Sequence, residues 1–154
     1  MAWVTGTREL VAAVRTAKQF LTYVSAGPFQ YAVAEALALP DAYYAGFRED
    51  LRAKRDLLAN GLREARFTVY EPQGTYFVTT DITPLAPGTD ALAFCRELPT
   101  RTGVVAVPNS VFYDHPTAGR TQVRFTFCKK QDVLTEAASR LKGLAAQDGS
   151  PSPT

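Results

Sequence analysis

Arg124 is the residue whose type and position best suit ligand binding. It lies in residues 122–128, QVRFTFC, where apolar and polar side chains alternate. This period of two residues is typical of a strand, and it places Arg124 on the face opposite the apolar side chains. A planar guanidinium on a rigid strand can hold a carboxylate through two parallel hydrogen bonds. A solvent-facing arginine on a half-exposed sheet explains the same spacing, so both interpretations stay open.

A turn and a loop hold the other candidates for a binding pocket. Gly74 lets the backbone approach a ligand closely, and Tyr76 can line a pocket with its ring. A plain turn that leads into a strand accounts for both residues equally well. Phe112 and Tyr113 lie in the irregular loop 108–119, and loops on a rigid scaffold often carry binding residues. Simple loop packing is the competing interpretation of that loop.

The sequence offers little for other kinds of catalysis. Its one histidine, His115, lies in a loop with Pro and Asp, and a Ser-His-Asp arrangement needs partners that spacing alone does not identify. A small unrelated enzyme that uses His115 remains a hypothesis, and it predicts that changing His115 abolishes an activity. No set of Cys and His has zinc-ligand spacing, and neither a Gly-x-Gly-x-x-Gly nor a Walker loop occurs. We therefore predict no metal site and no site for nucleotide phosphates.

Composition and charge exclude several classes of partner. The 154 residues include 17 basic and 15 acidic side chains, for a formal net charge of +2. This balance gives no electrostatic reason to propose nucleic acid or an anionic membrane as a partner. No apolar run is long enough for a membrane helix, and the N-terminus lacks the basic-then-apolar pattern of a secretory signal. Cys95 and Cys128 lie in apolar contexts that favour reduced, buried thiols, so we expect a cytoplasmic protein.

Periodicity and turn residues predict that the chain contains both helices and strands. A β-β-α-β-β-α unit follows a long helix, on which Asp50 is placed to pair with Lys54. Leu92, Cys95 and Leu98 are predicted to face inward from the helix that holds them. The predicted elements are a strand at 2–5, helices at about 7–21, 29–37 and 41–65, strands near 67–69 and 76–78, a loop at 83–89, a helix at 90–98, strands at 104–107 and 122–128, and a last helix through 134–144.

Five segments, taken in order, resemble class I/II aminotransferases of fold type I. The nearest subgroup is that of the kynurenine, methionine and N-succinyldiaminopimelate aminotransferases, and the resemblance covers about residues 2–145. Each motif alone is of modest specificity, but five in this order with similar gaps are fairly specific. The segments are residues 2–6 (AWVTG), 29–34 (FQYAVA), 74–77 (GTYF), 103–113 (GVVAVPNSVFY) and 123–129 (VRFTFCK).

The resemblance implies an α/β chain that contains the C-terminal domain of an aspartate-aminotransferase-like fold. Residues 1–40 are expected to be a remnant of the large domain that binds pyridoxal 5′-phosphate, namely its last strand and helices. Residues 41–146 are expected to form the α+β small domain, with a long linking helix followed by the β-β-α-β-β-α unit. The polar, Pro- and Ser-rich residues 147–154 are expected to be a disordered tail.

The resemblance also bears on the cofactor. The family holds pyridoxal 5′-phosphate as a Schiff base on a lysine just upstream of a segment like Lys-x-Gly-Trp-Val-Thr-Gly. Residues 2–6 match the end of that segment, with Met1 in place of what precedes it. We therefore expect this chain to lack the Schiff-base lysine, a nearby basic residue and the aspartate that pairs with the pyridine nitrogen. It is expected to hold no catalytic residue and, alone, no cofactor. The lysines that do not match the motif are Lys18, Lys54, Lys129, Lys130 and Lys142.

What the resemblance carries over is the substrate side of an active site. Arg124 matches the arginine that binds the substrate α-carboxylate, a role that suits the shape of its guanidinium. The other matches are Gly74 and Tyr76 at the small-domain edge of the pocket, Phe112 and Tyr113 in the loop near its entrance, and Tyr23, assigned to cofactor binding across the dimer, in a stretch that reaches the neighbouring subunit's site.

The implied function is that of a fragment of an enzyme that transfers an amino group between an amino acid and a 2-oxo acid. Within the subgroup, N-succinyldiaminopimelate aminotransferase of lysine biosynthesis is the favoured identification. A misassigned gene start, a frameshift or a split enzyme would each explain such a fragment, which is expected to be inactive alone. The alternative is a non-catalytic α+β binding or interaction module derived from the small domain. Upstream DNA that encodes a Lys-containing segment leading into Ala2 favours the fragment.

The resemblance implies two protein partners. Family members are homodimers, and a missing N-terminal half is a further expected partner. Without that half, residues 1–40 lack their packing partner, so apolar faces near Trp3, Phe20 and Phe29 are expected to be exposed and to promote self-association.

Overall fold

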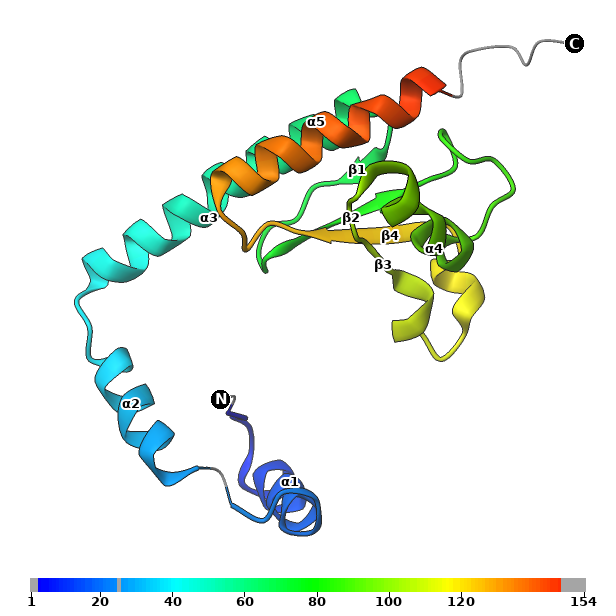
Figure 1. The fold of residues 1–154 in the computed structure, drawn as a ribbon. Coiled ribbons are helices and arrows are strands. Elements are labelled where there is room, and N and C mark those ends of the chain that lie inside the picture. The colour runs from blue at the N-terminus through cyan, green and yellow to red at the C-terminus, as the bar shows by residue number, and fades with distance from the viewer. Residues whose placement is uncertain (1–2, 25, 148–154) are drawn as a thin grey trace, which may run out of the picture. The chain divides into compact units, whose positions relative to one another are not determined.

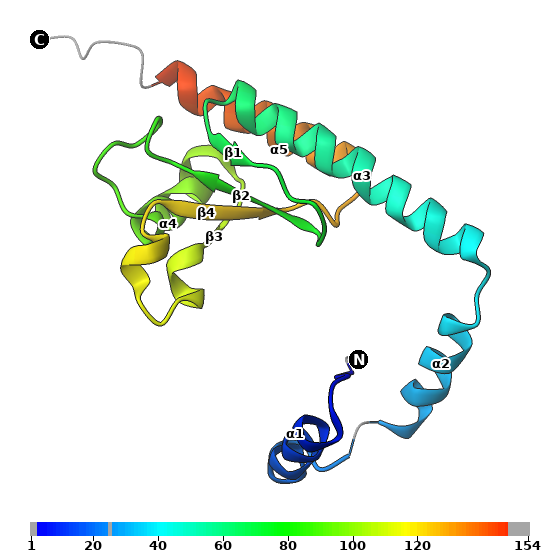
Figure 2. The same cartoon turned by 180° about the vertical axis from the view of Figure 1, so that it is seen from behind.

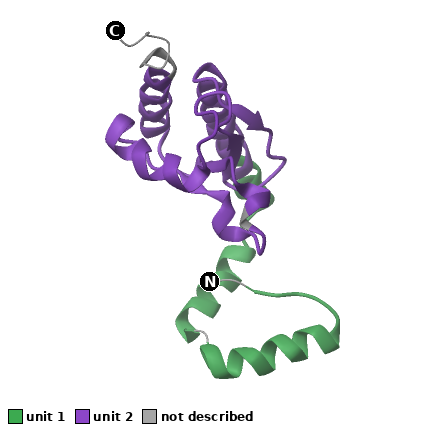
Figure 3. Cartoon of the chain, turned by 90° about the vertical axis from the view of Figure 1, so that its right-hand side faces the viewer, with its two compact units in different colours: residues 1–46 green, residues 47–154 purple. Residues whose placement is uncertain are grey.

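A computed structural model describes residues 3–24 and 26–147 of the chain. Residues 1–46 and residues 47–154 form two compact units (Figure 3). Helix α3 (Asp41–Glu64) begins in the first unit and continues into the second. The tail predicted to be disordered lies, from residue 148 onward, outside the described residues.

The first unit contains two helices whose ends match the sequence signals. Helix α1 (Arg8–Leu21) begins after Thr7, whose side chain accepts a hydrogen bond from the Leu10 backbone N–H (3.5 Å). Helix α2 (Gly27–Leu37) has Pro28 in its first turn, where a missing N–H costs nothing, so it starts two residues earlier than predicted. In the described part of α1 and α2, no residue is buried.

The strand predicted at residues 2–5 is not found in the described residues. Residues 3–7 have no regular secondary structure, and Ala2 lies outside the described part. A strand needs a neighbour for its backbone N–H and C=O groups, and the described sheet lies wholly in the second unit. As expected, Trp3, Phe20 and Phe29 are exposed.

The second unit is a four-stranded antiparallel sheet with helices packed on one face (Figures 1 and 2). The strand order is β1-β2-β4-β3, so β4 is an interior strand. After α3, the elements are β1 (Thr68–Tyr70), β2 (Phe77–Asp81), α4 (Ala91–Thr102), β3 (Val107–Pro108), the 3-10 helices η1 (Asn109–Phe112) and η2 (Pro116–Gly119), β4 (Gln122–Thr126) and α5 (Gln131–Gln147). This order matches the predicted β-β-α-β-β-α unit.

The core lies between the sheet and the helices. Its sheet side consists of the alternate residues of β2 and β4 that face the helices, such as Val78, which is fully buried opposite Phe125. The Phe67 ring meets the Phe125 ring edge-on, with centroids 5.4 Å apart. The helix side of the same cluster is Leu58 and Leu62 of α3, Phe94 and Leu98 of α4, and Leu134, Leu141 and Leu144 of α5. Because one face of β4 is filled in this way, its intervening residues lie on the opposite face of the sheet.

Helix α3 and helix α5 match their predictions well. The long helix ends at Glu64, one residue from the predicted end, and Asp50 pairs with Lys54 at 2.6 Å. In both views α5 lies along α3 (Figures 1 and 2), and Gly61 of α3 is the point where the Ala138 side chain of α5 comes closest. None of the described helices combines the length and apolar character needed to cross a lipid bilayer.

Two predictions about helix α4 and its neighbours were wrong. The Asp90 side chain caps the helix by accepting from Ala93 N (2.8 Å). Leu98 is buried as predicted, but Phe94 is buried in the first turns of the helix where Leu92 was expected, and Leu92 is 43% exposed. The helix also runs to Thr102, past Pro99, and ends at Gly103 in the left-handed conformation.

The strand predicted at 104–107 is shorter than expected. Only Val107 and Pro108 pair with β4, and Val105 is exposed. The Val104 N–H is not available to a ladder, because it donates to the Thr102 hydroxyl (3.1 Å). This segment therefore leaves helix α4 as an irregular connection rather than as a buried strand.

The two thiols differ in burial. Cys95 is half-buried, and burial raises the pKa of its thiol to about 11, which makes it a poor nucleophile. Cys128 is exposed, so the prediction of a buried thiol was wrong at that position; it lies just past β4, where its Sγ is 3.0 Å from the Thr126 hydroxyl.

Asp81 at the end of β2 makes stability depend on pH. Burial opposes its charged form, but hydrogen bonds from the Thr121 hydroxyl (2.6 Å) and the Thr83 N–H (2.7 Å) outweigh burial and lower its pKa below the ordinary value of 3.8. A carboxyl with a lowered folded pKa stabilises the fold above its unfolded pKa, and this contribution is lost as pH falls through the folded value.

We therefore expect Asp81→Asn to lower the free energy of unfolding at pH 7 and to lose this difference from the wild type below about pH 3.8. Urea unfolding between pH 2 and pH 7 measures it, with Asp114→Asn, in an exposed loop, as the control. A difference that persists unchanged at the lowest pH would show that the Asp81 charge is not its source.

Candidate functional site

Arg124 lies on the face of the sheet opposite the core, as its strand periodicity predicted. Its neighbours Val123 and Phe125 are buried against the helices, whereas the Arg124 side chain is half-buried. Since β4 is interior, Arg124 is paired on both sides, with Thr79 of β2 and Val107 of β3. The backbone that carries the guanidinium is therefore held by two ladders of hydrogen bonds.

Two phenylalanine rings contact the Arg124 guanidinium. Its central carbon lies 3.8 Å from the centroid of the Phe112 ring and 4.6 Å from that of the Phe77 ring. Phe77 comes from β2, and Phe112 from the 3-10 helix η1. Contacts of a cation with ring faces at such distances contribute roughly 0.5–2 kcal/mol each. We call these three side chains the arginine stack.

The in-plane donors of the arginine stack are available for a ligand. Within residues 3–24 and 26–147, the Arg124 guanidinium has neither a hydrogen-bond acceptor nor an acidic partner. A guanidinium carries five N–H donors in its plane, and contacts with ring faces use none of them. The arrangement is therefore suited to bind a carboxylate edge-on through two parallel hydrogen bonds.

Tyr76 adjoins the arginine stack, whereas Gly74 lies in a turn beside α3. The Tyr76 ring meets the Phe77 ring edge-on at 5.7 Å, and its carbonyl accepts from Phe127 N (2.8 Å). Gly74 borders a shallow hollow next to α3. Arg55 of α3 holds this turn by donating to the Pro72 carbonyl (3.2 Å). The structure thus brings Tyr76, but not Gly74, into the group of rings around Arg124.

The loop that carries Phe112 and Tyr113 is anchored to β4. Asn109, 8% exposed, donates from Nδ2 to Gln122 Oε1 (3.3 Å), and Gln122 is on the same strand face as Arg124. The Tyr113 ring covers Gly119 so closely that a Cβ there would overlap it. Tyr113 therefore holds the loop together, and Phe112 is the loop residue that reaches Arg124.

Two other side chains that the sequence singled out, Tyr23 and His115, are not part of the arginine stack. Tyr23 belongs to the first unit, is 74% exposed and has a positive φ of 60°; its role stays a prediction. His115 is exposed at the start of η2. Phe77, which lies in the 74–77 segment but was not among the predicted site residues, belongs to the stack. Its period-two spacing to Thr79 could have placed it on this face, but only the β2–β4 register brings it to Arg124.

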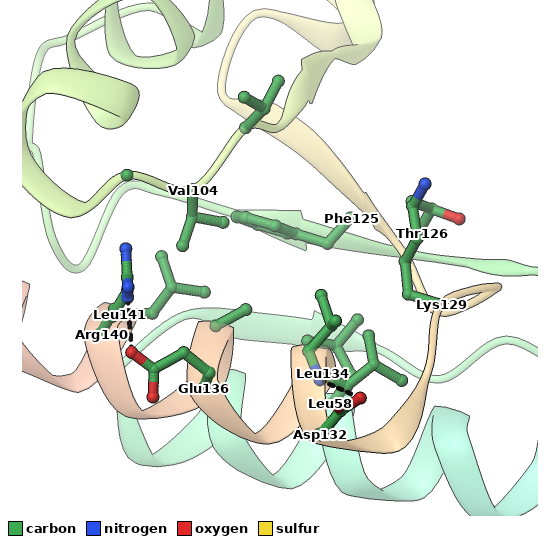
Figure 4. Close-up of a pocket in the computed structure, with 14 residues that line it drawn as sticks. Leu58, Val104, Phe125, Thr126, Lys129, Asp132, Leu134, Glu136, Arg140 and Leu141 are labelled. Carbon is green, nitrogen blue, oxygen red and sulfur yellow. Dashed lines mark hydrogen bonds and ion pairs between the residues drawn. The ribbon is translucent and has the colours of Figure 1, made fainter.

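A separate open groove of about 620 Å³ lies on the second unit, between α5 and residues 103–105 (Figure 4). Its walls are mainly apolar and include Phe125, Leu134 and Leu141, and its rim carries the Arg140–Glu136 ion pair (2.8 Å). None of the residues predicted from the sequence to bind substrate or cofactor lines this groove.

The five lysines of this chain are each either paired with another side chain or exposed. A Schiff-base lysine must be enclosed and free to react. Lys18 donates to the Thr22 hydroxyl (2.7 Å), and Lys54 and Lys142 form ion pairs with Asp50 and Glu64; Lys129 and Lys130 are exposed near the end of β4. Among the described residues, none of these lysines is therefore both enclosed and unpaired.

Comparison with known proteins places this site in a family. The sequence model of "aminotransferase class I and II" matches residues 1–141. A probable N-succinyldiaminopimelate aminotransferase of Mycobacterium tuberculosis is 48% identical, over 94% of this chain and 38% of its own length. The methionine aminotransferase of Escherichia coli is 35% identical, over 86% of this chain and 34% of its own length. The chain thus spans less than two fifths of these relatives.

Solved structures agree with the sequence match. The Mycobacterium tuberculosis N-succinyldiaminopimelate aminotransferase superposes with a TM-score of 0.79 at 50% identity, over 90% of this chain and 36% of that one. A variant of Thermus thermophilus aspartate aminotransferase gives 0.72 at 27% identity, over 90% and 37%. The fold is therefore aspartate-aminotransferase-like, as predicted. The chain belongs to the aminotransferase class I and II family, in the subgroup that the five sequence segments indicated.

Proposed function

We propose that the chain supplies the carboxylate-binding part of an aminotransferase that moves an amino group between an amino acid and a 2-oxo acid. The observation that carries the proposal is the Arg124 guanidinium, half-buried on an interior strand, with aromatic rings on it and no acceptor among the described residues. In this role Arg124 binds the substrate α-carboxylate and thereby orients the amino or keto carbon next to it. Phe112 and Tyr76 are proposed to line the pocket beside Arg124, with Tyr113 next to Phe112 in the same loop; Gly74, in the turn beside α3, is not brought to Arg124.

The proposed substrate is N-succinyldiaminopimelate, and the proposed pathway is lysine biosynthesis. Identity of 48% to a protein with that name supports it. All amino acids carry the α-carboxylate that this arginine would bind. Selectivity between amino acid side chains therefore has to come from the rest of the pocket.

The division of the chain follows from the same proposal. Residues 1–40 are the remnant of the cofactor-binding large domain, and residues 41–146 are the small domain. The exposed apolar side chains of helices α1 and α2 support this division, because they are the surface that a missing partner segment would cover. Tyr23 is proposed to reach the neighbouring subunit of a homodimer.

The family to which the chain belongs uses pyridoxal 5′-phosphate, and we propose that residues outside this chain hold it. The paired or exposed state of the lysines described above supports this assignment. The chain's own contribution is then limited to binding and orienting the substrate.

A chimera tests the proposal directly. In it, residues 1–154 replace the matching segment of the Mycobacterium tuberculosis relative, and amino transfer to or from N-succinyldiaminopimelate is measured. We expect the chimera to be active. Arg124→Lys keeps the charge but loses the two-pronged geometry, so we expect kcat/KM to fall by about 10- to 100-fold, the equivalent of one charge-assisted hydrogen bond.

The control for this substitution is Arg96→Lys on the exposed side of α4, which should leave kcat/KM unchanged. If Arg124→Lys has no larger effect than Arg96→Lys, Arg124 does not bind the substrate. A chimera that folds but transfers no amino group would instead favour a non-catalytic binding module. The groove along α5 is the feature that such a module would use.

A further inference from the structure

We propose that Phe112 is a positioning residue that, together with Phe77, fixes the plane of the Arg124 guanidinium so that only its N–H edge is open to a carboxylate. This inference rests on the proposed function, because it assigns a task to the side chains next to the proposed carboxylate-binding arginine. It extends that function by naming the residue that holds the arginine in its binding orientation.

The two rings hold the guanidinium from different parts of the fold. Phe77 sits on β2, in register with Thr126, one diagonal step from Arg124 across the ladder. Phe112 comes from η1, more than 30 residues further along the chain, and is the nearer ring at 3.8 Å against 4.6 Å. A rigid strand thus supplies one contact, and a short 3-10 helix supplies the closer one.

Such contacts orient an arginine without using up its binding capacity. A free arginine side chain has about 2 kcal/mol of rotamer entropy to lose when it is fixed. Ring faces attract the weakly hydrated faces of a guanidinium, whereas an acidic partner would occupy its in-plane donors. Among the described residues Arg124 contacts ring faces but has no acidic partner. The guanidinium is therefore oriented, and its in-plane N–H groups remain available to an anion.

Contacts of the neighbouring loop residues hold Phe112 in place. Asn109, at the first position of η1, is buried and donates to Gln122, two residues before Arg124 on β4. The loop is closed further along by the Tyr113 ring against Gly119. Phe112 itself is 58% exposed, so it makes little contribution to the core. An exposed ring that contacts a cation in this way acts on the cation rather than on the fold.

The test uses the full chain labelled with nitrogen-15 and follows the Arg124 Nε–Hε resonance by NMR. Rings stacked on a guanidinium shift this proton upfield. We expect Phe112→Leu to remove most of that shift and to weaken the binding of pyruvate, a small 2-oxo acid, by about three- to tenfold. Phe112→Tyr should restore both. Val111→Ala, an exposed neighbour on η1, should change neither.

The outcomes separate this inference from the proposed function. Pyruvate-dependent changes in the backbone amide resonances of β4 report binding in every variant, and Arg124→Gln should abolish them; if pyruvate binds as well as before, the proposed carboxylate role of Arg124 fails. If Arg124→Gln abolishes binding while Phe112→Leu leaves both the ring shift and the affinity unchanged, only the positioning role is overturned. A wild-type chain without any pyruvate-dependent shift also overturns it, because an already oriented guanidinium has to bind the carboxylate. The backbone amide spectrum of each variant verifies that it is folded.

Discussion

The purified 154-residue chain is expected to transfer no amino group when it is mixed with pyridoxal 5′-phosphate, an amino acid and a 2-oxo acid. Transamination needs a lysine that binds the cofactor covalently and then moves a proton. Three lysines are engaged with Thr22, Asp50 or Glu64, and the other two are exposed. The proposed role of Arg124 is to bind the substrate carboxylate, and binding alone moves no proton.

Conversion of a chromogenic or coupled 2-oxo acid measures this expectation, with heat-denatured chain and free cofactor as the background. The chimera described above, assayed in parallel, shows that the substrates and the assay are competent. Turnover by the chain alone that clearly exceeds background, needs both substrates and saturates with each would contradict the expectation. It would then be necessary to find which of the five lysines reacts.

Gly61→Ala is expected to lower the free energy of unfolding by about 1–3 kcal/mol, the usual cost of forcing extra atoms into a packed core. Gly61 is buried in α3, where a Cβ would overlap the Ala138 side chain of α5 and lie 3.4 Å from its Cα. Alanine favours a helix over glycine by about 1 kcal/mol, so the packing cost has to exceed this gain. Urea unfolding measures the net effect.

Two variants make the interpretation of Gly61→Ala specific. Gly143→Ala in α5, where a Cβ meets no atom within 4 Å, should raise stability by up to about 1 kcal/mol. The double variant Gly61→Ala with Ala138→Gly should be more stable than the sum of the two single changes allows, because the overlap is relieved. If the two changes add independently, the helices move apart easily at this point and the close approach is not rigid.

The parts of the fold that the sequence predicted best are those with a strong period. Helix α3 and strand β4 each bury one face against the same core, so their hydrophobic spacing is regular and their bounds came out within a few residues. The same regularity put Arg124 on the face away from the core. Family resemblance then favoured a binding arginine over a solvent-facing one, a choice that spacing alone left open.

Features that depend on tertiary contacts were beyond the reach of the sequence. Phe77 belongs to the arginine stack only because β2 pairs with β4 in a particular register. The inward face of α4 was predicted only in part: Leu98 is buried as expected, but Phe94, not Leu92, points to the core, because packing against the sheet and its neighbours selects the buried face. The strand predicted at residues 2–5 has no sheet to join in the described structure. Hydrophobic spacing along a segment does not reveal whether a neighbouring strand is there to pair with it.

Because β4 is an interior strand, substitutions on it and on the loop beside it have different consequences for the fold. Arg124 is paired on both sides, so its amide should exchange with solvent only when the sheet itself opens, and substitutions that disturb the strand will reduce the yield of folded protein. Phe112 is exposed on the 3-10 helix η1, so substitutions there do not disturb the strand. Selection or engineering can therefore change position 112 without unfolding the sheet, and the expected effect falls on the orientation of the Arg124 guanidinium rather than on the fold.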